Sequence, residues 1–291
     1  MTGVTTLEPG RPVEGVFAVR RKERRMSRKG SPYLALTLGD ATGTIPAVIF
    51  DEPDWFAGQF EEGDRVRVTG EVTDRGGRSV LRVRSLRPAE AADAEVELIP
   101  RSHRDPEDMW GFVLGLADEV HDPALRALLD RMTGDAVLAE AWRTVPCTRS
   151  GHHAYLGGLV EHTVGVAMVC QSLTTWHPRL DADLLVTAAL LHDVGHTRNW
   201  EVRSATVEQT DEGRALGHLA IGLQMVDQAA RASGVDGEHR LALLHAIAWH
   251  HGPPAGQHVG QASAEAIALW RANSMEAGVK ARMEGASALD D

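Results

Sequence analysis

The sequence predicts two domains of different class, an all-β barrel followed by an all-α domain. Two observations carry this prediction. Up to Pro88, short apolar runs alternate with polar residues between turns rich in Gly and Asp, which is typical of strands. From Trp110 onward, apolar residues recur at helical spacing instead. We therefore expect a first domain at 1–88, a linker rich in Ala, Asp, Glu and Pro at 89–108, and a helical domain at 109–291.

Five strands and one short helix are expected in the first domain. The strands are predicted at 15–20, 33–38, 44–50, 65–72 and 79–86. Two of the connections, 40–43 and 74–77, contain the Gly and Asp that hairpin turns favour. A helix at 51–60, with Pro53 near its start, falls between the third and fourth strands. This order is that of an OB-fold barrel.

A basic run distinguishes the first domain from the rest of the acidic chain. The net charge is -11, yet residues 1–88 hold 15 Lys and Arg against 12 Asp and Glu. OB-folds bind single strands through a basic groove and aromatic faces on which bases stack, which suits RNA and DNA alike. We expect the contacts from the run between the first two strands: Arg20, Arg21, Lys22, Arg24, Arg25, Arg28, Lys29 and Tyr33. A solvated polar face, with Tyr33 in the core, is the alternative.

Histidine is concentrated in the second domain, where twelve of the 14 lie between His152 and His258. The motifs GGLVEHT, LLHDVG, LGH and WHHG each place imidazole beside apolar core residues. Burying several such groups without a shared partner would cost a few kcal/mol for each one. We therefore expect a metal centre with these ligands: His162, His192, Asp193, His218, His250 and His251.

Imidazole and carboxylate ligands suit one or two divalent transition ions, Mn²⁺, Fe²⁺, Ni²⁺ or Zn²⁺. Such ions lower the pKa of water and offset charge on a phosphate, so phosphate ester hydrolysis is the expected reaction. The catalytic candidates are Asp193, His196 and His251. His152 and His153, just ahead of a Gly-Gly turn, are candidates to face a substrate phosphate.

These motifs, in this order, resemble the HD superfamily of phosphohydrolases. More narrowly, the chain resembles the YhaM family of 3′–5′ exoribonucleases, which join an N-terminal OB-fold to an HD domain. The matching stretches are 30–45, 152–163, 190–195 and 210–218. The resemblance implies a metal-dependent exoribonuclease whose OB-fold delivers a single strand to the HD centre. Two alternatives stay open: an HD hydrolase of a small nucleotide or cyclic phosphodiester, and a single-strand-binding protein with weakened turnover.

Three features depart from the pattern of that family. His196 follows the His-Asp-x-Gly run where the resemblance implies Lys. Asn273 stands where it implies an Asp as the closing metal ligand, and Asn can coordinate only through a neutral carbonyl. Glu276, one turn further on, is a candidate to compensate. A loop rich in Gly and Pro at 252–260 is expected to shape the entrance to the site.

No apolar run approaches the roughly 20 residues that span a bilayer, and the N-terminus lacks the pattern of a signal peptide. The two cysteines, Cys147 and Cys170, have neither disulfide-framework nor CxxC spacing, so we expect reduced packing residues. These features predict a cytoplasmic protein with no membrane partner and leave a homo-oligomer open.

Overall fold

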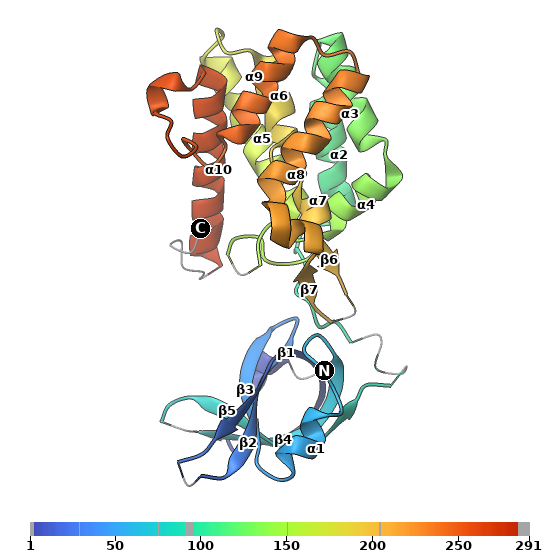
Figure 1. Cartoon of the computed structure of the whole chain (residues 1–291), viewed down its shortest axis with the longest axis vertical. Helices are drawn as coiled ribbons and strands as arrows, with labels where there is room; N and C mark the ends of the chain where they lie inside the picture. Colours follow the sequence, from blue (N-terminus) through green and yellow to red (C-terminus); the bar gives the residue numbers. More distant parts are fainter. Residues whose placement is uncertain are drawn as a thin grey trace. The chain divides into compact units, whose positions relative to one another are not determined.

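The computed structural model describes residues 3–28, 30–74, 76–90, 93, 96–149, 151–203 and 205–284. The chain divides into two compact units, one of residues 1–100 with 202–208 and one of residues 101–201 with 209–291. Strands build the first unit and long helices build the second (Figure 1). The predicted fold class, an all-β domain followed by an all-α domain, is confirmed.

The first unit is a closed five-stranded barrel of order β1-β2-β3-β5-β4 (Figure 1). Its elements are η1 (Val4–Thr6), β1 (Pro12–Met26), β2 (Pro32–Asp40), β3 (Gly43–Ile49), α1 (Pro53–Ala57), β4 (Arg65–Asp74) and β5 (Ser79–Pro88). All strand pairs are antiparallel except β3 with β5. Along β4, alternate residues such as Val66 and Val68 are buried in the barrel. The expected OB-fold order is confirmed.

Strand β1 is longer than the strand expected at 15–20. It continues to Met26 because its second half pairs with β2, with Arg21 opposite Thr37 and Met26 opposite Pro32. The basic run was expected between the first two strands, and that placement was wrong. Most of the run lies within β1, where neighbouring side chains point to opposite faces.

Residues 89–100, expected in the linker, extend the first unit. Leu98 is buried beside Ala205, a residue of the short 202–208 segment that also belongs to this unit. Asp93 is buried and forms an ion pair with Arg67 of β4. These contacts hold the segment after β5 against the barrel, and the chain enters the second unit only after Pro100.

Eight long helices form most of the second unit. They are α2 (Pro106–Asp118), α3 (Pro123–Thr133), α4 (Ala136–Thr144), α5 (Gly158–Trp176), α6 (Ala182–Leu191), α8 (Asp211–Ala232), α9 (Gly237–Ala248) and α10 (Ala264–Met283). Five begin after an Asp whose side chain accepts hydrogen bonds from the first free backbone N–H groups. Within the described residues, no helix is both long enough and apolar enough to span a bilayer.

Some short elements in the range 196–261 were not predicted. They are α7 (His196–Asn199), the strands β6 (Trp200–Val202) and β7 (Val207–Gln209), and η3 (Val259–Gln261). Segments of three or four residues are too short to display a hydrophobic period.

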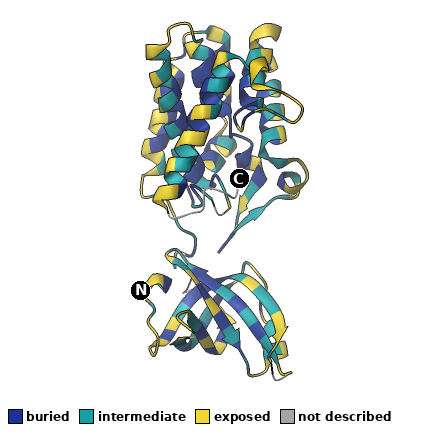
Figure 2. Ribbon diagram, turned by 90° about the vertical axis from the view of Figure 1, so that its left-hand side faces the viewer, coloured by how far each residue is buried: buried dark blue, intermediate teal, exposed yellow. Residues whose placement is uncertain are grey.

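Helix α6 runs through the interior of the helical unit. Every residue from Leu184 to Leu191 is buried, and α5, α9 and α10 pack against the helix. Buried residues gather in the interior of the helical unit (Figure 2). A helix enclosed on all sides is apolar all round, as this sequence is. The two residues after its C-terminal end, His192 and Asp193, therefore lie in the buried centre of the unit.

Candidate metal centre

His192 and Asp193 lie at the end of α6 and converge on one point. The helix ends at Leu191, so His192 is its C-cap and Asp193 lies just beyond. Nδ1 of His192 donates to the Ala189 carbonyl at 2.8 Å, so in the neutral ring the lone pair is on Nε2. That Nε2 lies 3.4 Å from Oδ2 of Asp193.

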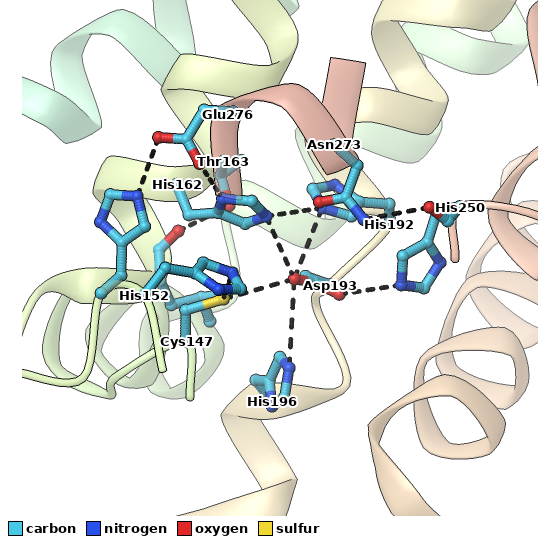
Figure 3. Close-up of polar contacts among 12 residues, drawn as sticks. Cys147, His152, His162, Thr163, His192, Asp193, His196, His250, Asn273 and Glu276 are labelled. Carbon is cyan, nitrogen blue, oxygen red and sulfur yellow. Dashed lines mark hydrogen bonds and ion pairs between the residues drawn. The ribbon is translucent and has the colours of Figure 1, made fainter. Parts of the chain in front are cut away.

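Each carboxylate oxygen of Asp193 faces its own group of imidazoles. Oδ2 lies 3.5 Å from Nε2 of His162 and 3.4 Å from Nε2 of His192 (Figure 3). Oδ1 lies 3.2 Å from Nε2 of His250 and 3.6 Å from Nε2 of His218. A carboxylate placed between two sets of nitrogen donors can bridge two divalent cations.

The buried polar atoms of this cluster fit a metal ion. Oδ1 of Asp193 and Nε2 of His250 are buried without a hydrogen-bond partner in the described part of the chain. Nδ1 of His250 lies 2.6 Å from the Ile247 carbonyl and donates to it, so its Nε2 also carries a lone pair. Leaving such atoms unpaired costs about 1–3 kcal/mol each. A divalent cation between them would satisfy both.

Of the donor sets that could hold an ion, two consist only of residues predicted as ligands, and the atoms within each set lie within 4.8 Å of one another. One set is His162, His192 and Asp193, and the other is Asp193, His218, His250 and His251. Burial would raise the pKa of Asp193, but His192 and His250 hold it well below its usual range. The shared residue is therefore a carboxylate at neutral pH. The residues that the sequence predicted as ligands are thus brought together.

A break in α8 helps to place His218. Gly217 has φ 71° and ψ 160°, so the helix is interrupted one residue before this histidine. Only glycine adopts such a conformation without strain. Nε2 of His218 then lies 3.1 Å from Nε2 of His251, which follows the end of α9.

Glu276 of α10 contacts Nδ1 of His162, the ring nitrogen that does not face Asp193. Its Oε2 accepts a hydrogen bond from Nδ1 of His162 at 2.6 Å, and its Oε1 lies 2.8 Å from Nε2 of His153. Burial would raise the pKa of Glu276, but these two histidines hold it well below its usual range. The sequence suggested Glu276 as a substitute ligand. The structure places it as the carboxylate that orients His162, an arrangement common around metal sites.

Replacing Glu276 by Gln should weaken metal binding by about 10–100-fold while leaving the fold intact. The amide would present an N–H to one of the two histidines that Glu276 now accepts from, so one ring would lose its anchor. Isothermal titration with Mn²⁺ measures the change. Glu238→Gln, an exposed carboxylate at the start of α9, is the control and should bind as wild type does. Equal affinities for both variants would contradict this role.

Asn273 contacts the turn that carries His250. The side chain is 5% exposed, and its Nδ2 donates to the His250 carbonyl at 3.0 Å (Figure 3). Its amide group thus supports the position of a predicted ligand. Coordination through its carbonyl oxygen remains a prediction.

A pocket of about 700 Å³ opens onto the centre. Its walls include Asp193, His196, His218, His251, Asn273 and His152. His153 is completely buried and faces Glu276 and Tyr155 instead. Of the two histidines predicted to face phosphate, the structure therefore places His152 at the pocket.

Arg149 is a pocket residue that the sequence analysis missed. It is exposed, and it is the one Lys or Arg in the pocket wall among the described residues. It lies in the loop between α4 and α5, three residues before His152. Its position beside the His-His motif was the signal that could have identified it.

His196 and His251, two of the catalytic candidates, are neutral at pH 7. Burial lowers the pKa of His196 well below its usual value, and the ring of His218 stacks on it at 4.1 Å. Desolvation in the pocket wall, with His250 alongside, lowers the pKa of His251 to about 3. Neutral imidazoles suit metal ligation, whereas neither ring supplies positive charge to a phosphate.

In the barrel, two members of the basic run bind backbone carbonyls. Arg20 donates to the carbonyls of Leu98 at 2.6 Å and Ala205 at 2.9 Å. Nζ of Lys22 donates to the Phe60 carbonyl at 2.6 Å. These side chains hold the first unit together and do not extend into solvent.

Three others are exposed, and each pairs with a carboxylate. Arg24 lies 2.6 Å from Asp54, and both Arg21 and Arg25 form ion pairs with Glu23. A nucleic-acid phosphate would have to compete with these acidic groups. Exposed pairs of this kind are worth about 1 kcal/mol or less, so the competition is feasible.

Tyr33 is half-buried on β2, opposite Arg25 in the β1–β2 pairing. Its ring centroid lies 5.5 Å from that of Phe50, so two aromatic rings adjoin. Arg28 is exposed just after β1, and Lys29 lies outside the described residues. Two adjoining aromatic rings therefore lie beside the exposed arginines of β1, and base stacking on Tyr33 remains a prediction.

Comparison with known proteins agrees with this geometry. The HD domain model matches residues 159–281, and the model described as an OB-fold nucleic acid binding domain matches residues 15–99. The 3′-5′ exoribonuclease YhaM of Shouchella clausii is 30% identical over 86% of this chain and 78% of its own length. The protein of the same name from Halalkalibacterium halodurans is 28% identical, with 86% of this chain and 78% of its own covered. The resemblance expected from the sequence is confirmed, and the chain belongs to the YhaM family of 3′–5′ exoribonucleases.

Proposed function

We propose that this protein hydrolyses single-stranded RNA from its 3′ end at the Asp193 centre. The observation that carries the proposal is the buried carboxylate whose two oxygens face separate sets of imidazoles at the base of a pocket. Relatives named 3′-5′ exoribonuclease support the choice of RNA and the direction of degradation.

In this proposal His162, His192 and Asp193 hold one divalent ion, and Asp193, His218, His250 and His251 hold a second. Mn²⁺, Fe²⁺, Ni²⁺ and Zn²⁺ suit these donors. Such ions, when bound, lower the pKa of water and offset negative charge on the reacting phosphodiester. The protein keeps the donors in place, because backbone carbonyls anchor His192 and His250 and Glu276 anchors His162.

The barrel would hold the strand upstream of the reacting end. Tyr33 and Phe50 offer aromatic faces, and Arg21, Arg24, Arg25 and Arg28 are exposed cations along the same part of the chain. Stacking and backbone contacts of this kind tolerate any base sequence. A processive or distributive exonuclease needs that tolerance, because every nucleotide passes in turn.

We expect Arg149→Ala to raise the KM for RNA about tenfold, with a smaller change in kcat, since a charged hydrogen bond to phosphate is worth about 1.5–3 kcal/mol. Arg149→Lys should recover much of the loss because it restores the charge. Steady-state kinetics on a single-stranded oligonucleotide measure the effect. Arg179→Ala, an exposed arginine between α5 and α6, is the control. If both alanine variants behaved alike, Arg149 would not contact the substrate.

The proposed activity is tested with one oligoribonucleotide labelled at either end, in the presence of Mn²⁺. A 3′ label should appear at once in mononucleotides, whereas a 5′ label should pass through a ladder of shortening products. Early release of a 5′-labelled mononucleotide would overturn the direction. Binding of RNA without any product would favour a single-strand-binding protein. Hydrolysis of small nucleotides or cyclic phosphodiesters, without hydrolysis of RNA, would favour an HD hydrolase of small substrates.

A further inference from the structure

We propose that Cys147, Asp193 and His196 form an additional cation site in the pocket, suited to a soft divalent ion such as Zn²⁺. We call these three residues the sulfur-containing set. The set shares only Asp193 with the two donor sets of the proposed hydrolytic centre. It would make the pocket of this protein selective for zinc-like ions, because thiolate prefers them to Mn²⁺ or Mg²⁺.

The spacing of the three donor atoms fits one ion. Sγ of Cys147 lies 3.6 Å from Oδ2 of Asp193, and Nε2 of His196 lies 4.0 Å from the same oxygen. All three donor atoms lie within 4.8 Å of one another. Ligands of a tetrahedral zinc ion, at roughly 2.0–2.3 Å from it, are roughly 3.3–3.6 Å apart. The set is therefore close to the geometry of a ligand triad.

Burial and access both favour binding at this position. Cys147, Asp193 and His196 are only 1%, 3% and 6% exposed, yet all three line the pocket, so an ion can reach them. His152, another pocket residue, places its Nε2 3.6 Å from the sulfur and offers a further donor.

The hydrogen bonds of His196 fit ligation when the two neighbouring amides take the reverse orientation. Its Nδ1 lies 3.3 Å from Nδ2 of Asn199, whose Oδ1 lies 3.1 Å from Nε2 of Gln209. Exchanging oxygen and nitrogen in both amides reverses every donor in this chain of contacts. Nδ1 of His196 then donates, and its Nε2 turns a lone pair toward the set.

Binding at this site needs no redox partner. A sulfur–metal bond forms, the S–H bond of Cys147 breaks, and its proton passes to water in the pocket. The simpler alternative is that the thiol only donates a hydrogen bond to Asp193. The two differ in one spectroscopic property, since only a metal-bound thiolate gives charge-transfer absorption.

To test the proposal, the full chain is stripped of metal with a chelator and titrated with Co²⁺, and near-ultraviolet absorption is recorded at each addition. The chain has two cysteines, and Cys170 is fully buried in α5, where desolvation raises its pKa to about 12. A Cys170→Ala protein therefore reports on Cys147 alone. We expect a thiolate-to-cobalt band in Cys170→Ala and none in Cys147→Ser. Zinc bound per chain should fall by one ion in Cys147→Ser and stay unchanged in Cys170→Ala.

Absence of the band from Cys170→Ala would overturn the proposal even if Cys147→Ser failed to fold. Persistence of the band in Cys147→Ser would overturn it as well. Both readouts are independent of RNA hydrolysis, so this inference and the proposed activity can fail separately.

Discussion

Replacing Asp193 by Asn should lower the rate of RNA hydrolysis at least about 10³-fold and remove most of the bound metal. Even residues that only orient metal ligands change affinity or activity by about 10–100-fold. Asp193 is the residue shared by both donor sets, and its oxygens face His162 and His192 on one side and His218 and His250 on the other. Removing its charge would therefore affect both sets at once.

The experiment compares kcat and metal content of wild type and Asp193→Asn on the same single-stranded RNA. Asp108→Asn is the matched control, because it removes an exposed carboxylate in the first turn of α2, in the same unit. This control should retain full activity and metal. Substantial hydrolysis by Asp193→Asn would show that the reaction does not depend on the centre.

The second large effect is expected from Gly195→Ala, which should destabilise the helical unit by at least about 3 kcal/mol. A Cβ at position 195 would lie 2.0 Å from the His218 carbonyl oxygen and 2.6 Å from the Gly222 nitrogen. Both are backbone atoms of α8 and cannot turn aside as a side chain would. The start of α7 and α8 would have to separate, and His218 would move away from Asp193.

Thermal unfolding followed by the helical circular dichroism signal measures this effect. Gly111→Ala and Gly115→Ala are matched controls in α2, because a Cβ at either position meets no atom within 4 Å. Helical propensity predicts a gain of up to about 1 kcal/mol for each. If Gly195→Ala unfolded at the wild-type temperature, the close approach of α7 to α8 would not contribute to the stability of the helical unit.

The architecture could be predicted wherever a segment was long enough to show a period. Apolar and polar residues alternate along the five strands, and apolar residues recur at helical spacing along the eight long helices. Both domains and the barrel order therefore followed from pattern alone. The extension of β1 to Met26 was missed because its charged residues carry no apolar alternation. Pairing with β2, a tertiary interaction, determines that segment.

The histidines that gather around Asp193 could be predicted, but their arrangement could not. Motif residues such as His162 and His192 are identifiable by type and spacing. Which atom faces which oxygen of Asp193 depends on helices distant in sequence. Glu276 and His162, for example, are 114 residues apart.

Cys147 shows the same limit. Its spacing from Cys170 indicated a packing residue, whereas the fold brings its sulfur to 3.6 Å from Asp193. Nothing local in the sequence could have indicated this contact, because 46 residues separate the two positions along the chain.

The most direct test of the hydrolytic centre is to measure bound metal and RNA shortening on the same samples. Wild-type protein stripped with a chelator is titrated with Mn²⁺, and metal per chain and rate are recorded at each point. We predict no shortening without metal and a rate that rises in step with metal bound, with neither occurring in Asp193→Asn. Full hydrolysis by the stripped protein, or saturation with metal without any hydrolysis, would contradict the account.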